Sequence, residues 1–144
     1  SYFRGRAAGS MSDEIDALLQ KAQRRLQAGA SNFSGAYFED VAEDAYLAMY
    51  YAASALILAE PDLEKFSTKH QFVSSEFGRR FAKTGRVDRK LGRYLHKAFE
   101  KRNAGLYEVG DSVSREDAEE QLQRATEFVT KANQFMKGAG GDLE

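Results

Sequence analysis

The stretch GAYFEDVAEDAYLAMYYAASALILA, residues 35–59, decides the fold of this chain. Its apolar side chains recur at helical spacing, which predicts one long helix with a continuous inward stripe. The stripe consists of Phe38, Val41, Ala42, Ala45, Met49, Ala52, Leu56 and Ala59. In the second half of the stretch the other faces are also apolar, and such a helix is central in a bundle or lies in a subunit interface. For an interface we expect contributions from Tyr46, Tyr50 and Tyr51.

Further helical patterns extend outward from this stretch in both directions. We expect helices over residues 15–26, 67–83 and 88–102, and a last helix from residue 114 onward. Residues 29–34 are expected to form a turn between the first two helices. No segment shows strand-like alternation of apolar and polar residues. The sequence therefore predicts an all-α fold, an antiparallel up-and-down bundle of four to five helices.

Single residues mark where these helices begin and end. Pro61 breaks the central helix, and Gly85 is a suitable cap for the C-terminal end of the next one. Ser114 and Asp117 form a capping box at the start of the last helix.

Composition and length are typical of one soluble globular domain, with 144 residues, 42% hydrophobic and 30% charged. We expect residues 1–10 to be a vector-derived tail, 11–137 the helical domain, and 138–144 a disordered tail. The chain has no cysteine, which excludes disulfides and thiolate catalysis and favours a cytoplasmic location. No apolar run is long enough for a membrane span, and no histidine and carboxylate set has metal-ligand spacing. We therefore expect neither a membrane partner nor a metal or other cofactor.

Charge is distributed unevenly along the second half of the chain. Residues 79–102 contain ten basic and two acidic side chains, whereas residues 108–127 contain seven acidic and two basic ones. One interpretation is that the two segments form solvated faces that pair with each other. The other is a surface that attracts phosphates. It predicts RNA or nucleotide contacts at Arg93, His96, Lys97 and Lys101.

Arg102 ends the inward stripe of the basic helix, where a guanidinium needs a carboxylate, a phosphate or water. Asn103 and Tyr107 add an amide and a phenol nearby, so these three residues are the candidate catalytic set. In the alternative interpretation Arg102 pairs with Asp44 or Glu43 of the central helix and only holds the bundle together.

The chain has only two histidines, and neither is an obvious catalytic group. His70 lies on the apolar stripe of its helix, so we expect a satisfied, partly buried side chain. His96 falls on a different face from the apolar stripe of the basic helix, so we expect it to be exposed.

Four segments in this order resemble the HEPN domain family. Residues 45–53, AYLAMYYAA, are similar to the family's AYYAMFHAA helix, and residues 67–70, STKH, are similar to its KTH element. Residues 81–85, FAKTG, resemble FVKTG, and residues 98–107, AFEKRNAGLY, resemble the segment that ends in ADY. The resemblance covers roughly residues 15–136.

The resemblance implies an up-and-down helical bundle, a homodimer, and RNA or a nucleotide as ligand. Many HEPN proteins are metal-independent ribonuclease toxins paired with a nucleotidyltransferase antitoxin. Their motif is an arginine, a polar residue and a following histidine, and two motifs line one cleft of the dimer. Arg102 and Asn103 match its first half, whereas Tyr107 stands where the histidine is expected and Leu106 replaces an aspartate. The alternative hypotheses are a non-catalytic helical module that docks a nucleotidyltransferase and a bundle that binds a small ligand.

Overall fold

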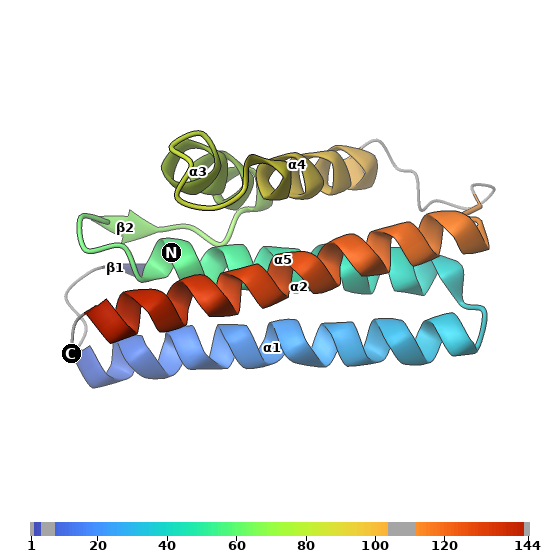
Figure 1. The fold of residues 1–144 in the computed structure, drawn as a ribbon, viewed down its shortest axis with the longest axis horizontal. Helices are drawn as coiled ribbons and strands as arrows, with labels where there is room; N and C mark the ends of the chain where they lie inside the picture. The colour runs from blue at the N-terminus through green and yellow to red at the C-terminus, as the bar shows by residue number, and fades with distance from the viewer. Residues whose placement is uncertain (1, 4–7, 104–111, 143–144) are drawn as a thin grey trace.

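The computed structural model describes residues 2–3, 8–103 and 112–142 of the chain (Figure 1). Its elements in order are β1 (Tyr2–Phe3), α1 (Ala8–Ser34), α2 (Phe38–Leu58), β2 (Lys65–Phe66), α3 (His70–Phe77), the π-helical segment η1 (Gly78–Ala82), α4 (Arg89–Asn103) and α5 (Arg115–Asp142). The predicted all-α bundle is confirmed.

The four longer helices alternate in direction along the chain. Helices α1, α2 and α5 pack against one another, with α5 in front of α2 in the view, and α3, η1 and α4 pack over α2 (Figure 1). The chain runs from left to right in α1 and α4 and from right to left in α2 and α5 (Figure 1). Within the described residues no helix is both long and apolar enough to cross a bilayer.

Helix α2 occupies the centre of the bundle because most of its surface is apolar. It contacts α1, α3, α4 and α5, and most of its residues from Val41 onward are buried. Its alanines allow close helix approach, and the large core side chains come from α2 and from its neighbours. Among them Phe77 stacks on Phe81 and packs against Phe128 of α5.

The predicted turn at residues 29–34 is wrong, because α1 continues as a helix to Ser34. Contacts with α2 and α5 hold this last part of α1 helical. Asp44 accepts hydrogen bonds from Arg25 at 2.9 Å and from Asn32 at 2.8 Å, and Gly29 leaves room for Leu122 of α5. The turn comes later, where Ala36 adopts a φ of 63°.

The predicted helix over residues 67–83 begins later and is not uniform. Helix α3 starts at His70, and its hydrogen bonding becomes π-helical in η1. Before α3, strand β2 pairs with β1 in antiparallel register. The expectation that the chain has no strand is therefore corrected by this short two-stranded pair. Among the caps, Gly85 has the expected positive φ of 77°, and the Ser114 hydroxyl accepts the N–H of Asp117 at 3.0 Å. Helices α1 and α5 extend beyond residues 11 and 137, the expected limits of the domain.

Candidate functional site

Arg102 and His70 meet on the surface of the bundle although 32 residues separate them in sequence. His70 is the first residue of α3, and Arg102 lies in the last turn of α4. The guanidinium Nη1 of Arg102 lies 3.3 Å from Nδ1 of the imidazole. A guanidinium can only donate hydrogen bonds, so this contact requires Nδ1 as acceptor and places the ring proton of His70 on Nε2.

Two tyrosines of α2 fix the position of the imidazole. The hydroxyl of Tyr46 lies 2.5 Å from Nδ1 of His70 and donates to it in the same tautomer. The imidazole is stacked on the Tyr50 ring with centroids 4.4 Å apart and an interplanar angle of 17°. The hydroxyl of Tyr50 donates to the backbone oxygen of Thr68, just ahead of α3. His70 therefore has a defined orientation relative to Arg102.

The guanidinium of Arg102 has two further neighbours, both on α2. Its Nη2 pairs with Oε2 of Glu43 at 3.2 Å, and it lies 5.2 Å from the centroid of the Tyr46 ring. The side chains of Arg102 and Glu43 remain 34% and 38% exposed, so a ligand in solvent can reach the guanidinium. The predicted pairing of Arg102 with an acid of α2 is confirmed for Glu43. Asp44, the other candidate, instead pairs with Arg25.

Electrostatics keeps His70 neutral near pH 7. Burial lowers the pKa of His70 below its usual 6.5, and the nearby charge of Arg102 lowers it further. Burial also raises the pKa of Tyr46 far above the usual range of a phenol. The cluster therefore combines a permanent cation, a neutral imidazole and a protonated phenol.

The other predicted site residues are only partly accounted for. Asn103 ends α4, and its side chain lies outside the described residues, as does all of Tyr107. Of the predicted RNA contacts, Arg93, His96 and Lys97 are exposed on α4, and Lys101 is half-buried. The exposure expected for His96 is confirmed, and it lies 3.5 Å from Glu100.

The three tyrosines predicted for a subunit interface are mostly buried within the bundle of this chain. Tyr46 and Tyr50 are 1% and 8% exposed, and Tyr51 is half-buried. This burial leaves Tyr46 and Tyr50 little surface to offer to a second subunit, because α2 is covered by α1, α3, α4 and α5. An interface role stays a prediction, with Tyr51 the most accessible of the three.

Sequence reasoning missed that His70 belongs beside Arg102. It predicted a satisfied, partly buried histidine, and the half-buried imidazole with its hydrogen bonds confirms that description. The sequence signal that could have indicated the contact is that His70 and Arg102 are both polar residues at the edge of an apolar stripe. In the described parts of the chain, no three histidine or acidic side chains come together in a way that would hold a metal ion.

Comparisons with known proteins show the family of this chain. The family model of the HEPN domain matches residues 15–135. A Methanocaldococcus jannaschii protein named "Putative toxin MJ0605" is 30% identical over 125 residues, covering 87% of this chain and 90% of its own length. A second protein of that organism, "Putative toxin MJ0142", is 26% identical over 85% of this chain and 82% of its own. A UPF0332 protein of Gloeobacter violaceus is 31% identical over 88% of this chain and 98% of its own.

Proposed function

This chain belongs to the HEPN domain family, and from that premise we propose that it binds RNA and cleaves it without a metal ion, as a toxin. The observation that carries the proposal is the contact between Arg102 and His70. The family motif places a histidine after the arginine, and here a histidine reaches the arginine from the preceding helix instead.

The cluster supplies groups that RNA cleavage needs. Cleavage requires a base for the 2′-hydroxyl, a cation for the phosphorane and a proton donor for the leaving 5′-oxygen. In the proposed reaction His70 removes the 2′-hydroxyl proton, and the 2′-oxygen forms a bond to phosphorus. The bond to the 5′-oxygen breaks, which yields a 2′,3′-cyclic phosphate and a 5′-hydroxyl end once the leaving oxygen takes up a proton. Arg102 binds the phosphate oxygens throughout.

The protonation states of the cluster fit these roles. A histidine with a lowered pKa is in its basic form at pH 7, so its nitrogen lone pair is available. The lone pair of Nδ1 faces Arg102 and Tyr46, so a 2′-hydroxyl that replaces the Tyr46 hydroxyl would lie beside the guanidinium. Asn103 and Tyr107, close to Arg102 in sequence, remain candidates for orienting the phosphate and protonating the leaving oxygen.

The biological part of the proposal rests on family membership. Two relatives carry the word toxin in their names, which supports a toxin role for this chain. The proposal includes a homodimer in which two clusters line one cleft, and a nucleotidyltransferase partner as antitoxin. Light scattering of the purified protein tests the first point, and co-purification with a nucleotidyltransferase encoded next to it tests the second.

The direct test is cleavage of labelled total RNA in EDTA by the wild type, Arg102→Ala and His70→Gln. We expect cleavage by the wild type, loss in both variants and 2′,3′-cyclic phosphate ends in the products. Glu43→Gln is the matched control, because it removes the ion pair and keeps Arg102 in place. Absence of cleavage by the wild type on RNA of any source would refute the ribonuclease.

A second function is favoured by one feature of the same cluster. Arg102 and His70 both have partners within the chain, as a purely structural group requires. This favours a non-catalytic module that docks a nucleotidyltransferase. The two functions differ in salt response, because RNA binding through phosphates weakens steeply with salt and an apolar docking surface does not.

A further inference from the structure

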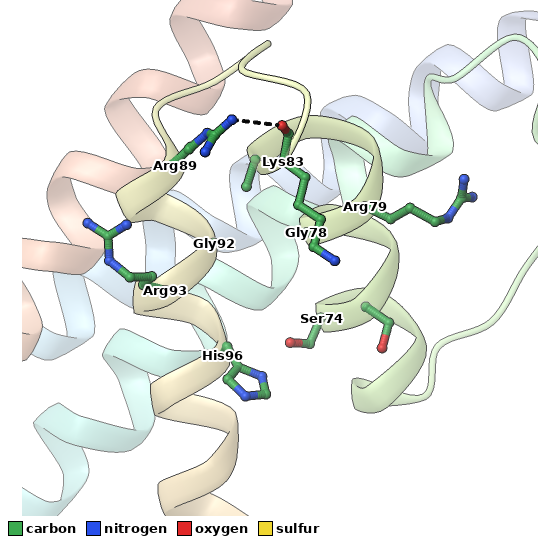
Figure 2. A pocket seen from close by; sticks show the side chains of 10 residues that line it. Ser74, Gly78, Arg79, Lys83, Arg89, Gly92, Arg93 and His96 are labelled. Carbon is green, nitrogen blue, oxygen red and sulfur yellow. Dashed lines mark hydrogen bonds between the residues drawn. The ribbon is translucent and has the colours of Figure 1, made fainter.

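A groove of about 790 Å³ lies between α3 with η1 on one side and α4 on the other (Figure 2). Its lining includes Ser74 from α3, Lys83 just after η1, and Arg93 and His96 from α4. His70 precedes Ser74 by one helical turn. Arg102 follows His96 by six residues, about 9 Å along a helix at 1.5 Å per residue. The groove and the Arg102 and His70 pair therefore share the same two helices.

The charged residues that line this groove are all cationic. Four cationic side chains line it, and none of its lining residues is acidic; the cations are Arg79, Lys83, Arg89 and Arg93. Arg79 is paired with Glu76 outside the lining, and Arg89 donates to the backbone oxygen of Lys83 at 3.4 Å (Figure 2). Lys83, Arg89 and Arg93 have no ion pair within the described part of the chain.

One cation on the α5 side of α4, Lys90, differs because it is neutralised within the chain. Lys90 pairs with Glu127 of α5 at 2.6 Å, and Lys131 of α5 pairs with Asp88 at 3.3 Å and with Glu127 at 3.1 Å. Glu127 of α5 thus compensates Lys90, while none of the described acidic residues lines the groove side of α4. The expected pairing of the two charged segments is confirmed for Lys90 and Glu127, and the attraction of phosphates stays a prediction.

The floor of the groove is made of residues with little or no side chain. Gly92 approaches Ala82 so closely that a Cβ on Gly92 would lie 2.7 Å from the Ala82 Cβ. A Cβ on Gly78 would meet nothing within 4 Å, so this position opens into free space. The floor is smooth and has no aromatic anchor pocket of the kind that dominates protein interfaces. The more suitable ligand is therefore a polyanion whose charges reach the cationic side chains of the groove, and a protein that inserts a side chain is less suitable.

We infer that this groove holds the phosphates of single-stranded RNA a few nucleotides from the bond placed at Arg102 and His70. The inference rests on the proposed function and adds a substrate requirement to it. RNA long enough to occupy both the pair and the groove is bound more tightly than RNA that occupies only the pair. Lys83 and Arg93 act in binding, whereas Arg102 and His70 act in the reaction.

Two changes test the groove without touching the pair. Lys83→Ala with Arg93→Ala removes the two groove cations that have neither an ion pair nor a side-chain hydrogen bond among the described residues, and the control Arg24→Ala with Lys137→Ala removes one arginine and one lysine from exposed positions on α1 and α5. Gly78→Glu places a carboxylate in the groove, and Gly78→Gln is its neutral match of the same shape. Because a side chain at Gly78 meets open space, both are expected to fold.

The first readout is cleavage in EDTA of an RNA dinucleotide and of an oligonucleotide of about 16 nucleotides. We expect the groove variants to lose about tenfold in kcat/KM on the long substrate, through KM, and to leave the dinucleotide unaffected. Equal losses on both substrates, or no loss on either, would overturn the inference while the ribonuclease stands.

The second readout is binding of the same oligonucleotide, which is independent of turnover. Each lost phosphate contact flattens the slope of log K against log salt by about 0.7, so the double variant should be flatter by about 1.4. If the wild type binds but does not cut, this slope alone decides whether the groove binds RNA. If the double variant keeps the wild-type slope for RNA but loses binding to polyglutamate, the groove binds an acidic protein segment and the inference is overturned.

Discussion

Replacing Arg102 with alanine should show whether its guanidinium is structural or catalytic, because the two roles predict different losses of stability and of cleavage rate. The structural contacts are a half-exposed ion pair with Glu43, a cation–π contact with Tyr46 and a hydrogen bond to His70. An exposed ion pair contributes up to about 1 kcal/mol, a cation–π contact about 0.5–1 and a hydrogen bond about 1. Because these contributions overlap, we expect Arg102→Ala to lower the free energy of unfolding by about 1–2 kcal/mol.

For a chain of this length that loss lowers Tm by roughly 3–8 °C, so the variant stays folded at 25 °C. Removal of a group that stabilises transition-state charge costs about 100–1000-fold in kcat. The assay is single-turnover cleavage of labelled RNA beside thermal unfolding of the same preparations. Glu43→Gln should show a small loss of stability with most of the activity retained.

The reasoning would be refuted by an Arg102→Ala protein that cleaves RNA at the wild-type rate. It would also be refuted by a variant whose loss of activity follows its loss of folded protein. In that second case Glu43→Gln should be impaired to a similar degree, and Arg102 would be structural.

Three further changes test the packing and the protonation of the bundle. The pKa of His70 is lower in the folded than in the unfolded chain, so as the pH falls below 6.5 the unfolded chain takes up this proton first. The wild type should therefore lose stability relative to His70→Gln between pH 7 and pH 5. Urea unfolding in which the free energies of the two proteins change equally with pH would contradict this. Arg80→Ala should cost about 1–2 kcal/mol, because it removes the ion pairs of Arg80 with Glu76 at 2.9 Å and with Asp62 at 2.8 Å while Glu76 keeps Arg79. The exposed Arg79→Ala should leave the denaturation midpoint almost unchanged, and equal midpoints for the two variants would argue against this. Gly92→Val should lower stability by about 1–3 kcal/mol by overpacking against η1, and calorimetry showing an unchanged Tm would contradict the close approach of α4.

The sequence predicted those features that depend on neighbours along the chain. The apolar stripe of α2, the cap at Gly85 and the side-chain cap at Ser114 are all local patterns, and all three are present. The turn at residues 29–34 was predicted from Gly29, yet contacts made by Asp44 of the next helix keep this segment helical. Contacts between helices outweighed the local preference of a glycine.

The candidate site was predictable only in part, because its two halves are far apart in sequence. Arg102 was identified from its place at the end of an apolar stripe, and pairing with Glu43 was among the alternatives. The contact with His70 depends on how α3 crosses α4, which helical periodicity does not specify. The family motif directed attention to residues after Arg102, whereas the histidine that the structure supplies precedes it.

The assembly of the cluster from three helices has a consequence for its control. His70 from α3 and Arg102 from α4 are held together by Tyr46 of α2, so the pair exists only while all three helices are docked. Helices α3 and α4 lie over one side of the three-helix unit formed by α1, α2 and α5 (Figure 1). Local opening of such an outer unit costs less free energy than global unfolding. A partner that lifts α4 would therefore separate Arg102 from His70, and faster hydrogen exchange confined to α4 would reveal the event.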